Sequence, residues 1–90
     1  FLPTVYSLYN NYPNPFNPTT TIKYDIPELS YVTIKIYDIV GEEVTTLLNE
    51  VQNAGRYQIK WNASELASGV YFYRIQAGQF SDTKKMILMK

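Results

Sequence analysis

The sequence predicts an all-β protein, an immunoglobulin-like antiparallel β-sandwich of about seven short strands. Several segments of about five to eight residues alternate apolar and polar side chains with a period of two. Turn-forming residues separate these segments at short intervals. Nine tyrosines, four phenylalanines and one tryptophan in 90 residues suit pleated surfaces better than helices. No segment carries a helix-length apolar period.

The first distinctive stretch, residues 10–19, contains three of the five prolines. Proline lacks the backbone N–H that a sheet or helix needs and pushes the residue before it toward extended conformations. We therefore expect a stiff connector whose asparagine side chains form local Asx-type turns. Phe16 lies in its middle and is too apolar for an idle loop, so we expect it to be buried as a plug on the core.

Residues 1–9 are expected to form a short first strand or an extended lead-in. The next two strands are predicted at residues 20–26 and 30–38, and Pro27 ends the first of them. In each strand three apolar residues of one parity should face the core: Ile22, Tyr24 and Ile26, then Val32, Ile34 and Ile36.

The segment from Asp38 to Gly41 predicts a type I turn followed by a glycine bulge. Asp38 can accept hydrogen bonds from the turn backbone, and Gly41 can adopt the left-handed conformation. A strand should return over residues 43–48, with a bulge or an early end because its apolar residues change parity. Residues 49–55 are expected to be a polar turn.

The next strand should place Tyr57, Ile59 and Trp61 on its inner face. Residues 64–68 are expected to form one helical turn, capped by Ser64 and placing Leu66 on the core. Residues 70–77 are apolar on both parities, which is typical of a central strand, and residues 80–89 should form the last one. Tyr71 follows Gly69 in a pattern similar to the tyrosine corner of immunoglobulin-like domains.

The composition argues against most catalytic chemistry. The chain has no cysteine, no histidine and a formal net charge of zero. Disulfides, the common nucleophile–base pairs and a basic face for nucleic acid are therefore not expected. No apolar run reaches the length of a membrane helix, and no signal peptide is present. The chain begins abruptly at Phe1, which suggests a piece of a longer protein.

Carboxylate pairs and a calcium site were the remaining chemical candidates. Glu42 and Glu43 are adjacent in a strand and should point to opposite faces, while Asp25 and Glu28 flank a proline turn and should be solvated. Two oxygen-rich sets lack the acidic density of calcium loops: Asn14 and Asn17 with Asp82, and Asn62 with Ser64 and Glu65. We therefore expect turn and cap bonding from these asparagines, no catalysis, no metal and no cofactor.

The aromatic content also raises a carbohydrate-binding alternative. Trp61 shares the parity of Tyr57 and Ile59 and should be buried. Tyr31 and Tyr37 share the opposite face of their strand and are the best candidates for an exposed aromatic pair. Half-exposed tyrosines are common on sheets, so a structural role is the preferred interpretation.

The last stretch combines basic residues with an apolar run on both parities. Lys84, Lys85 and Lys90 could be charges that protect an edge strand from pairing. Alternatively, one side of this strand closes the sandwich while its other side and its edge are offered to a receptor. The segment concerned is Thr83, Lys84, Lys85, Met86, Ile87, Leu88, Met89 and Lys90.

Several pieces of the chain, in this order and spacing, resemble a known family. They are Asn11-Tyr12-Pro13-Asn14-Pro15-Phe16-Asn17-Pro18-Thr19-Thr20-x-Ile22-x-Tyr24, Ile36-Tyr37-Asp38-x-x-Gly41, Ala54-Gly55-x-Tyr57-x-x-x-Trp61, Leu66-x-Ser68-Gly69-Val70-Tyr71-Phe72-Tyr73 and Thr83-Lys84-Lys85-Met86. The family is the type A C-terminal sorting domain of the type IX secretion system. The resemblance covers nearly the whole chain.

The resemblance implies a non-catalytic sorting signal that directs an attached cargo protein across the outer membrane. Such domains are recognised by a shuttle barrel protein and the translocon, and a sortase typically removes them and joins the cargo to anionic lipopolysaccharide, or the cargo is released. Localisation would be the cell surface or the medium, reached through the periplasm. Residues 1–10 would be a lead-in from the upstream cargo domain, and residues 11–90 the sorting domain.

The family positions carried over to this chain fall into two groups. The first is expected to act mainly through the fold: Pro13, Asn14, Pro15, Phe16, Asn17, Pro18, Asp38, Gly41, Gly69 and Tyr71. The second is the terminal stretch 83–90, which includes Lys85 and is expected to act in recognition. The main alternative is an immunoglobulin-like spacer or adhesion domain, similar to that of flagellar hook-capping proteins.

Overall fold

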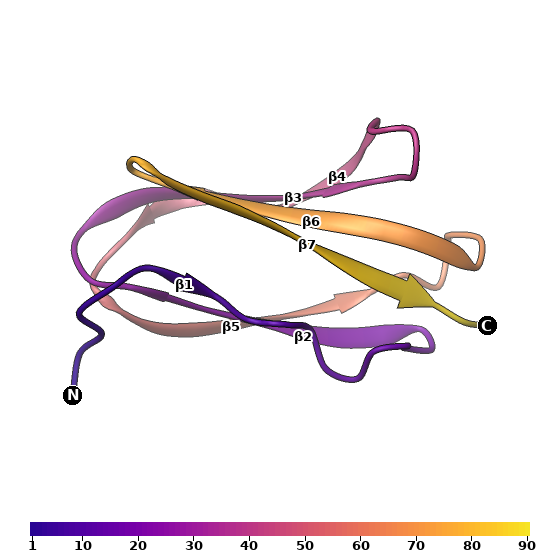
Figure 1. Ribbon diagram of the computed structural model, residues 1–90, viewed down its shortest axis with the longest axis horizontal. Coiled ribbons are helices and arrows are strands. Elements are labelled where there is room, and N and C mark those ends of the chain that lie inside the picture. The colour runs from indigo at the N-terminus through magenta and orange to yellow at the C-terminus, as the bar shows by residue number, and fades with distance from the viewer.

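The computed structural model describes residues 1–90 as two antiparallel sheets packed face to face (Figure 1). The smaller sheet, sheet A, has the order β1-β2-β5, and the larger one, sheet B, has the order β4-β3-β6-β7. The strands are β1 (Ser7–Leu8), β2 (Thr19–Ile26), β3 (Ser30–Tyr37), β4 (Glu43–Gln52), β5 (Gly55–Asn62), β6 (Gly69–Ala77) and β7 (Phe80–Leu88). The prediction of a seven-stranded all-β sandwich is confirmed.

The core lies between the sheets and contains the residues that the alternation predicted. Ile22 and Ile26 of β2 and Val32, Ile34 and Ile36 of β3 are fully buried. On β6 the inner parity is Tyr71, Tyr73 and Ile75, while Val70 and Phe72 are half-buried on the outer face. Each of these side chains removes apolar surface from water, which is the main stabilising term in so small a domain.

The β3–β4 turn has the predicted type I plus bulge geometry. The Gly41 N–H donates to the Asp38 carbonyl at 3.0 Å, and Gly41 has a φ of 88°. Asp38 Oδ1 accepts from the N–H groups of Val40 at 3.0 Å and Glu42 at 2.9 Å. The side chain therefore fixes the turn, as expected from the sequence.

Two expectations about the following strand need correction. β4 does not end near Leu48 but continues to Gln52, so the predicted polar turn over 49–55 shrinks to residues 53–54. The predicted irregularity is real: the β3–β4 register shifts between Ile34 and Lys35 and again between Ile36 and Tyr37. These shifts accommodate the change of apolar parity and allow β4 to keep pairing.

The predicted helical turn at residues 64–68 is wrong. The segment is a turn in which the Leu66 N–H reaches the Ala63 carbonyl at 3.0 Å, and Leu66 packs against the core as expected. The Ser64 N–H donates to Asn62 Oδ1 at 2.9 Å, so the capping side chain is Asn62 and not Ser64. Asn62 stabilises a tight turn there before Gly69 begins the next strand.

The tyrosine-corner interpretation of Tyr71 fits the structure. Its hydroxyl donates to the Ala67 carbonyl at 2.7 Å, four residues upstream. This bond ties the β5–β6 loop to the start of β6, as in immunoglobulin-like sandwiches.

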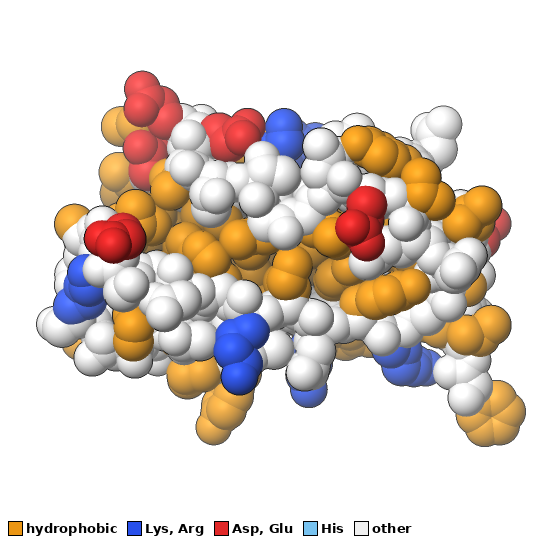
Figure 2. Space-filling view, turned by 180° about the vertical axis from the view of Figure 1, so that it is seen from behind, with side chains coloured by type: hydrophobic (Ala, Val, Ile, Leu, Met, Phe, Trp, Pro, Cys, Tyr) orange, Lys and Arg blue, Asp and Glu red, His pale blue; other side chains and the backbone are white.

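The two layers meet along β4 and β5 on one side of the sandwich. Figure 2, seen from that side, shows apolar side chains between the layers. Partly buried apolar residues of β4 and β5 pack against the core: Val44, Leu47, Leu48 and Ile59. No helix capable of crossing a membrane occurs in the structure.

Candidate functional site

The proline-rich connector lies directly beside the last strand, so two distant parts of the chain meet. The Phe16 N–H donates to the Ile87 carbonyl and the Met89 N–H donates to the Phe16 carbonyl, both at 2.9 Å. Asn14 Oδ1 accepts from the Ile87 N–H at 3.0 Å. Asn14 thus bonds 73 residues along the chain and does not form the local Asx turn that we expected. We call this pairing of residues 14–16 with residues 87–89 the terminal seam.

Phe16 is the side chain that anchors the terminal seam to the core. It is 2% exposed, which confirms the predicted plug. Its ring lies 5.9 Å from that of Trp61, which in turn stands edge-on to Tyr71 at 6.4 Å. Aromatic ring pairs such as these two add stability beyond that expected from the apolar area they bury.

A second set of polar contacts fixes the start of the connector. Asn11 is buried, and its Nδ2 donates to the Pro13 carbonyl at 3.2 Å and to Thr20 Oγ1 at 3.0 Å. The Thr20 hydroxyl also donates to the Pro13 carbonyl, at 2.9 Å. These bonds supply partners near a segment whose prolines cannot donate. Asn11 and Thr20 lie in the motif that resembles the family, but neither was assigned a role, and the nearest signal was the polar Thr20 at the inner parity of its strand.

The lead-in is also held in place. The hydroxyl of Tyr73, in the core, donates to the Tyr9 carbonyl at 2.7 Å, and burial raises the pKa of Tyr73 to about 12. Asp25 was expected to be solvated, but it is 6% exposed and bonded to the Tyr9 hydroxyl at 2.5 Å and Arg56 Nη1 at 2.9 Å. The cross-strand position of Arg56 opposite Asp25 explains this burial.

The outer edge of β7 is less open than we expected. Because the backbone groups of Ile87 point to the connector and away from β6, alternation directs those of Lys85 and Thr83 to the same edge. The Thr83 N–H is already bonded to Asp82 Oδ1 at 2.9 Å. Of the three outward N–H groups at residues 83, 85 and 87, only that of Lys85 has no side-chain acceptor, so part of this edge is already bonded within the domain.

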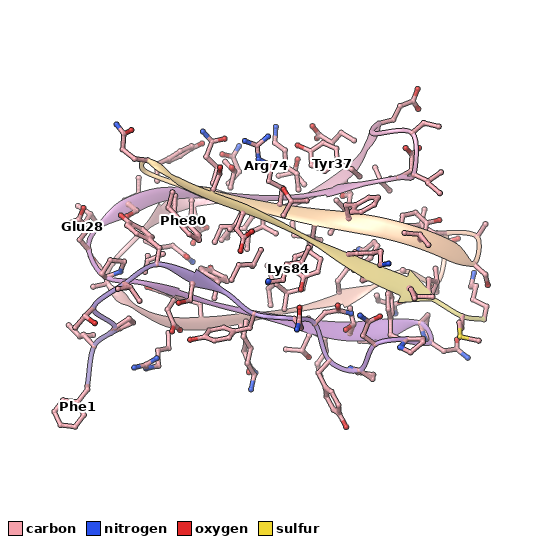
Figure 3. The ribbon with its side chains drawn as sticks, in the orientation of Figure 1. Phe1, Glu28, Tyr37, Arg74, Phe80 and Lys84 are labelled. Atoms are coloured by element: carbon pink, nitrogen blue, oxygen red, sulfur yellow. The ribbon has the colours of Figure 1, made fainter.

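The side chains of the terminal stretch have four different environments. Met86 and Leu88 are core residues at 0% and 1% exposure. Lys84 lies between the layers, 3.9 Å from Asp82 (Figure 3), whereas Thr83 and Lys85 are exposed on the outer face of sheet B. Ile87 and Met89 form the terminal seam through their backbones, while the Ile87 side chain is half-buried and that of Met89 is exposed.

Lys90 serves an internal contact. Its Nζ donates to the carbonyls of Ser64 at 2.6 Å and Leu66 at 2.7 Å, and its N–H donates to Ser68 Oγ at 2.9 Å. Within the folded domain, the terminal stretch therefore exposes Thr83 and Lys85 on the outer face of sheet B, and Met89, at 58% exposure, just after β7.

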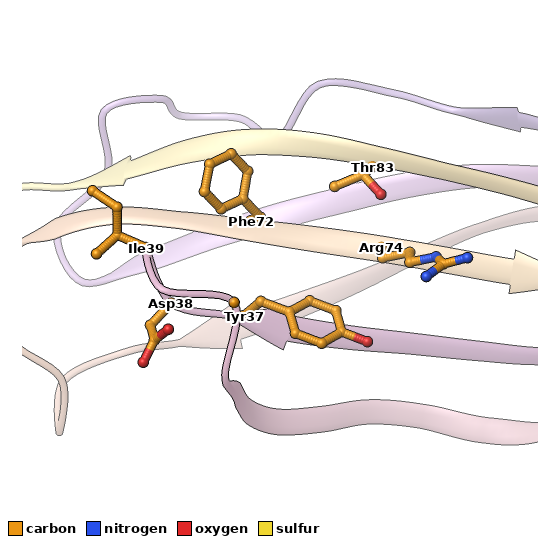
Figure 4. A pocket seen from close by; sticks show the side chains of 7 residues that line it. Tyr37, Asp38, Ile39, Phe72, Arg74 and Thr83 are labelled. Atoms are coloured by element: carbon orange, nitrogen blue, oxygen red, sulfur yellow. The ribbon is translucent and has the colours of Figure 1, made fainter.

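A groove of about 330 Å³ lies on the outer face of sheet B next to this exposed surface (Figure 4). It is lined by the β3–β4 turn and by residues of three strands: Tyr37, Asp38, Ile39, Gly41, Phe72, Arg74 and Thr83. The structure thus brings the motif residues Asp38 and Gly41 together with Thr83 of the terminal stretch. The sequence missed Phe72 and Arg74, although an apolar residue at the outward parity of a strand was a usable signal.

The aromatic residues considered for sugar binding do not form one surface. Trp61 is buried at 7% exposure, as predicted. Tyr31 is exposed and hydrogen-bonded to Asn49, but it lies six residues from Tyr37 on β3, roughly 20 Å along the strand. Of the asparagines considered for calcium, Asn14 and Asn62 use their side-chain oxygens to accept backbone N–H groups.

Comparisons with known proteins agree with the fold and its motifs. The sequence model of the family described as secretion system C-terminal sorting domain matches residues 10–89. No curated protein matches the chain. A solved structure with a TM-score of 0.61 is that of PorZ, described as an essential bacterial surface component of the type-IX secretion system of Porphyromonas gingivalis. The two are 22% identical, and the match covers 94% of this chain and 11% of the PorZ chain, so the likeness shows a shared fold.

Proposed function

Because the chain belongs to the family of secretion system C-terminal sorting domains, we propose that its folded form presents the terminal strand to the type IX machinery as the export address of a cargo protein. Membership makes it a type IX sorting signal, exported across the outer membrane to the cell surface or the medium. The proposal adds that recognition acts on the outer face around Thr83 and Lys85. The receptors would be a shuttle barrel protein and the translocon.

The observation that carries this proposal is the terminal seam. Backbone bonds at Phe16 and the side chain of Asn14 hold Ile87 and Met89 in place, and Met86 and Leu88 are locked in the core. The terminal strand is therefore ordered as part of the sandwich, with Lys85 exposed and in no ion pair. A preorganised surface of this kind lowers the entropic cost of binding.

The finer steps of export are part of the same proposal. Cargo would lie upstream of residues 1–10, and a sortase would cut before the anchored part of the lead-in, with release or surface attachment of the cargo. Phe1, Leu2 and Val5 are exposed, although Pro3 between them is buried, whereas Ser7 and Leu8 pair with β2. An exposed, unpaired segment is where proteases reach a folded chain. The domain itself would contribute no catalysis to these steps.

The experiment replaces single exposed residues, because deleting the terminal stretch would also remove Met86 and Leu88 from the core. The chain is fused behind a periplasmic reporter in a host with the type IX system, and surface delivery is measured. Lys85→Glu should lower delivery about tenfold while stability stays within about 0.5 kcal/mol, the usual range for surface changes.

The matched control is Lys23→Glu, which makes the same charge change at an exposed lysine of sheet A. Delivery with this variant should equal that of the unmodified chain. Equal delivery of the Lys85→Glu fusion would contradict recognition at the terminal strand, whereas equal losses with both variants would point to overall charge.

A further inference from the structure

The groove on the outer face of sheet B has mostly apolar walls. Phe72 and Tyr37 are cross-strand partners on β6 and β3, and Ile39 is 73% exposed at the tip of the turn. Figure 4 shows these three side chains around the space that Arg74 borders. Aromatic and apolar side chains at a concave surface are typical of the centre of a binding site.

Arg74 is the cation of this groove, and no carboxylate pairs with it. It is exposed and takes part in none of the three ion pairs of the domain, which are Lys35–Glu43, Arg56–Asp25 and Lys84–Asp82. Figure 3 shows Tyr37 and Arg74 projecting from the outer face of sheet B. A guanidinium in this position can hold a carboxylate through two parallel hydrogen bonds.

The acidic residues nearest the groove are already occupied. The Asp38 carboxylate accepts two backbone N–H groups of its own turn. Glu43 accepts from the Thr46 hydroxyl at 2.9 Å and pairs with Lys35 at 3.4 Å, and both contacts lower the pKa of Glu43. Lys85 lies opposite Phe72 in the cross-strand register, so Arg74 and Lys85 are two cations at the groove and its rim that no carboxylate pairs with.

We infer that this groove binds an extended peptide segment of the secretion receptor in which a carboxylate side chain neighbours an aromatic or large apolar one. The carboxylate would pair with Arg74, and the apolar side chain would lie against Phe72 and Tyr37. A small inorganic anion would leave these apolar walls unused, and one unpaired arginine is too little charge for a nucleic acid backbone. The inference rests on the proposed function and specifies the receptor chemistry.

The test uses the isolated domain and two probe peptides, Phe-Asp-Phe-Asp-amide and its Asn counterpart, each carrying the same fluorescent dye on its N-terminus. Fluorescence polarisation at low salt should show the Asp peptide binding at least about tenfold more tightly than the Asn peptide, with the difference reduced at high salt. Arg74→Glu should weaken binding of the Asp peptide about tenfold. The matched control is Lys60→Glu, which makes the same change of charge at an exposed residue of sheet A. This variant should bind the Asp peptide as tightly as the unmodified domain.

Three results would overturn the inference: no binding of the Asp peptide, equal binding of the Asp and Asn peptides, or unchanged binding by Arg74→Glu. Measuring surface delivery of the Arg74→Glu fusion distinguishes a wrong assignment of the groove from a wrong proposed function. If Arg74→Glu fusions are delivered normally while Lys85→Glu fusions are not, the groove is not the receptor site although the terminal strand still is.

Discussion

Phe16 is the residue on which the position of the connector depends most. A loop rich in proline and asparagine has few apolar side chains of its own to bury, and Phe16 supplies one that reaches the core at 2% exposure. The backbone of the same residue bonds to both Ile87 and Met89. Phe16 therefore holds the connector in two ways, by burying its ring in the core and by bonding its backbone to the last strand.

Phe16→Ala should lower the free energy of unfolding by roughly 3–5 kcal/mol, because it removes a buried ring and leaves a cavity. Chemical denaturation followed by circular dichroism measures the change. Tyr12→Ala is the control within the same connector, since Tyr12 is 80% exposed and its loss should cost less than about 0.5 kcal/mol. Similar small losses for both variants would show that the connector is not fixed to the core.

Asp25 shows what single-residue reasoning misses. Asp25 alternates with the inner residues Tyr24 and Ile26, so its place on the outer face of β2 was predicted correctly. Because it is charged and lies beside a proline turn, we also expected its carboxylate to be solvated. Burial arises because Tyr9 and Arg56, 16 and 31 residues away, both bond to its carboxylate. Partners brought by other strands cannot be read from a local pattern.

At the scale of the strands, alternation predicts most of the strands and their inner faces. Ile22, Tyr24 and Ile26 follow a period of two without exception, and all three are buried. β4 was harder, because Val44, Leu47 and Leu48 do not share one parity and its length depends on register shifts against β3. The strand continues because β3 supplies partners as far as Gln52, which is a tertiary and not a local cause.

Two buried tyrosines connect elements and make stability depend on pH. The Tyr24 hydroxyl donates to Gln52 of β4 at 2.5 Å, and that of Tyr73 donates to the Tyr9 carbonyl at 2.7 Å. Burial raises the pKa of each tyrosine to about 12, against an unfolded value near 10. The folded protein therefore keeps protons that the unfolded chain loses between these values.

The free energy of unfolding should consequently be insensitive to these groups below about pH 10 and fall as the pH rises from about 10 to 12. Urea unfolding at several pH values measures how the free energy of unfolding falls with pH. For each tyrosine, every unit by which its folded pKa exceeds its unfolded pKa contributes about 1.4 kcal/mol to the total loss. Tyr73→Phe removes one of the two groups and should give a shallower fall. An equal slope in this variant, or no fall at all, would contradict the assignment.

At the scale of the whole molecule, the sandwich joins the beginning of the domain to its end. Residues 14–16 pair with residues 87–89, and Tyr73 and Arg56 hold the lead-in through Tyr9 and Asp25. The order of motifs in the sequence predicted the family and the fold. It did not predict that Asn14 bonds to Ile87, because this depends on the connector lying beside β7. Nor did it predict that the β3–β4 turn and β7 line a common groove, because this depends on the strand order of sheet B.

The central claim is that the connector holds the terminal strand in a fixed position. Amide hydrogen exchange of the folded domain tests it directly, because it reports each backbone N–H separately. The N–H groups of Phe16, Ile87 and Met89 should exchange slowly, and that of Lys85, at the open part of the same edge, should exchange fast. If Ile87 and Met89 exchange as fast as Lys85, the terminal seam does not exist in solution and the account of an ordered export address is wrong.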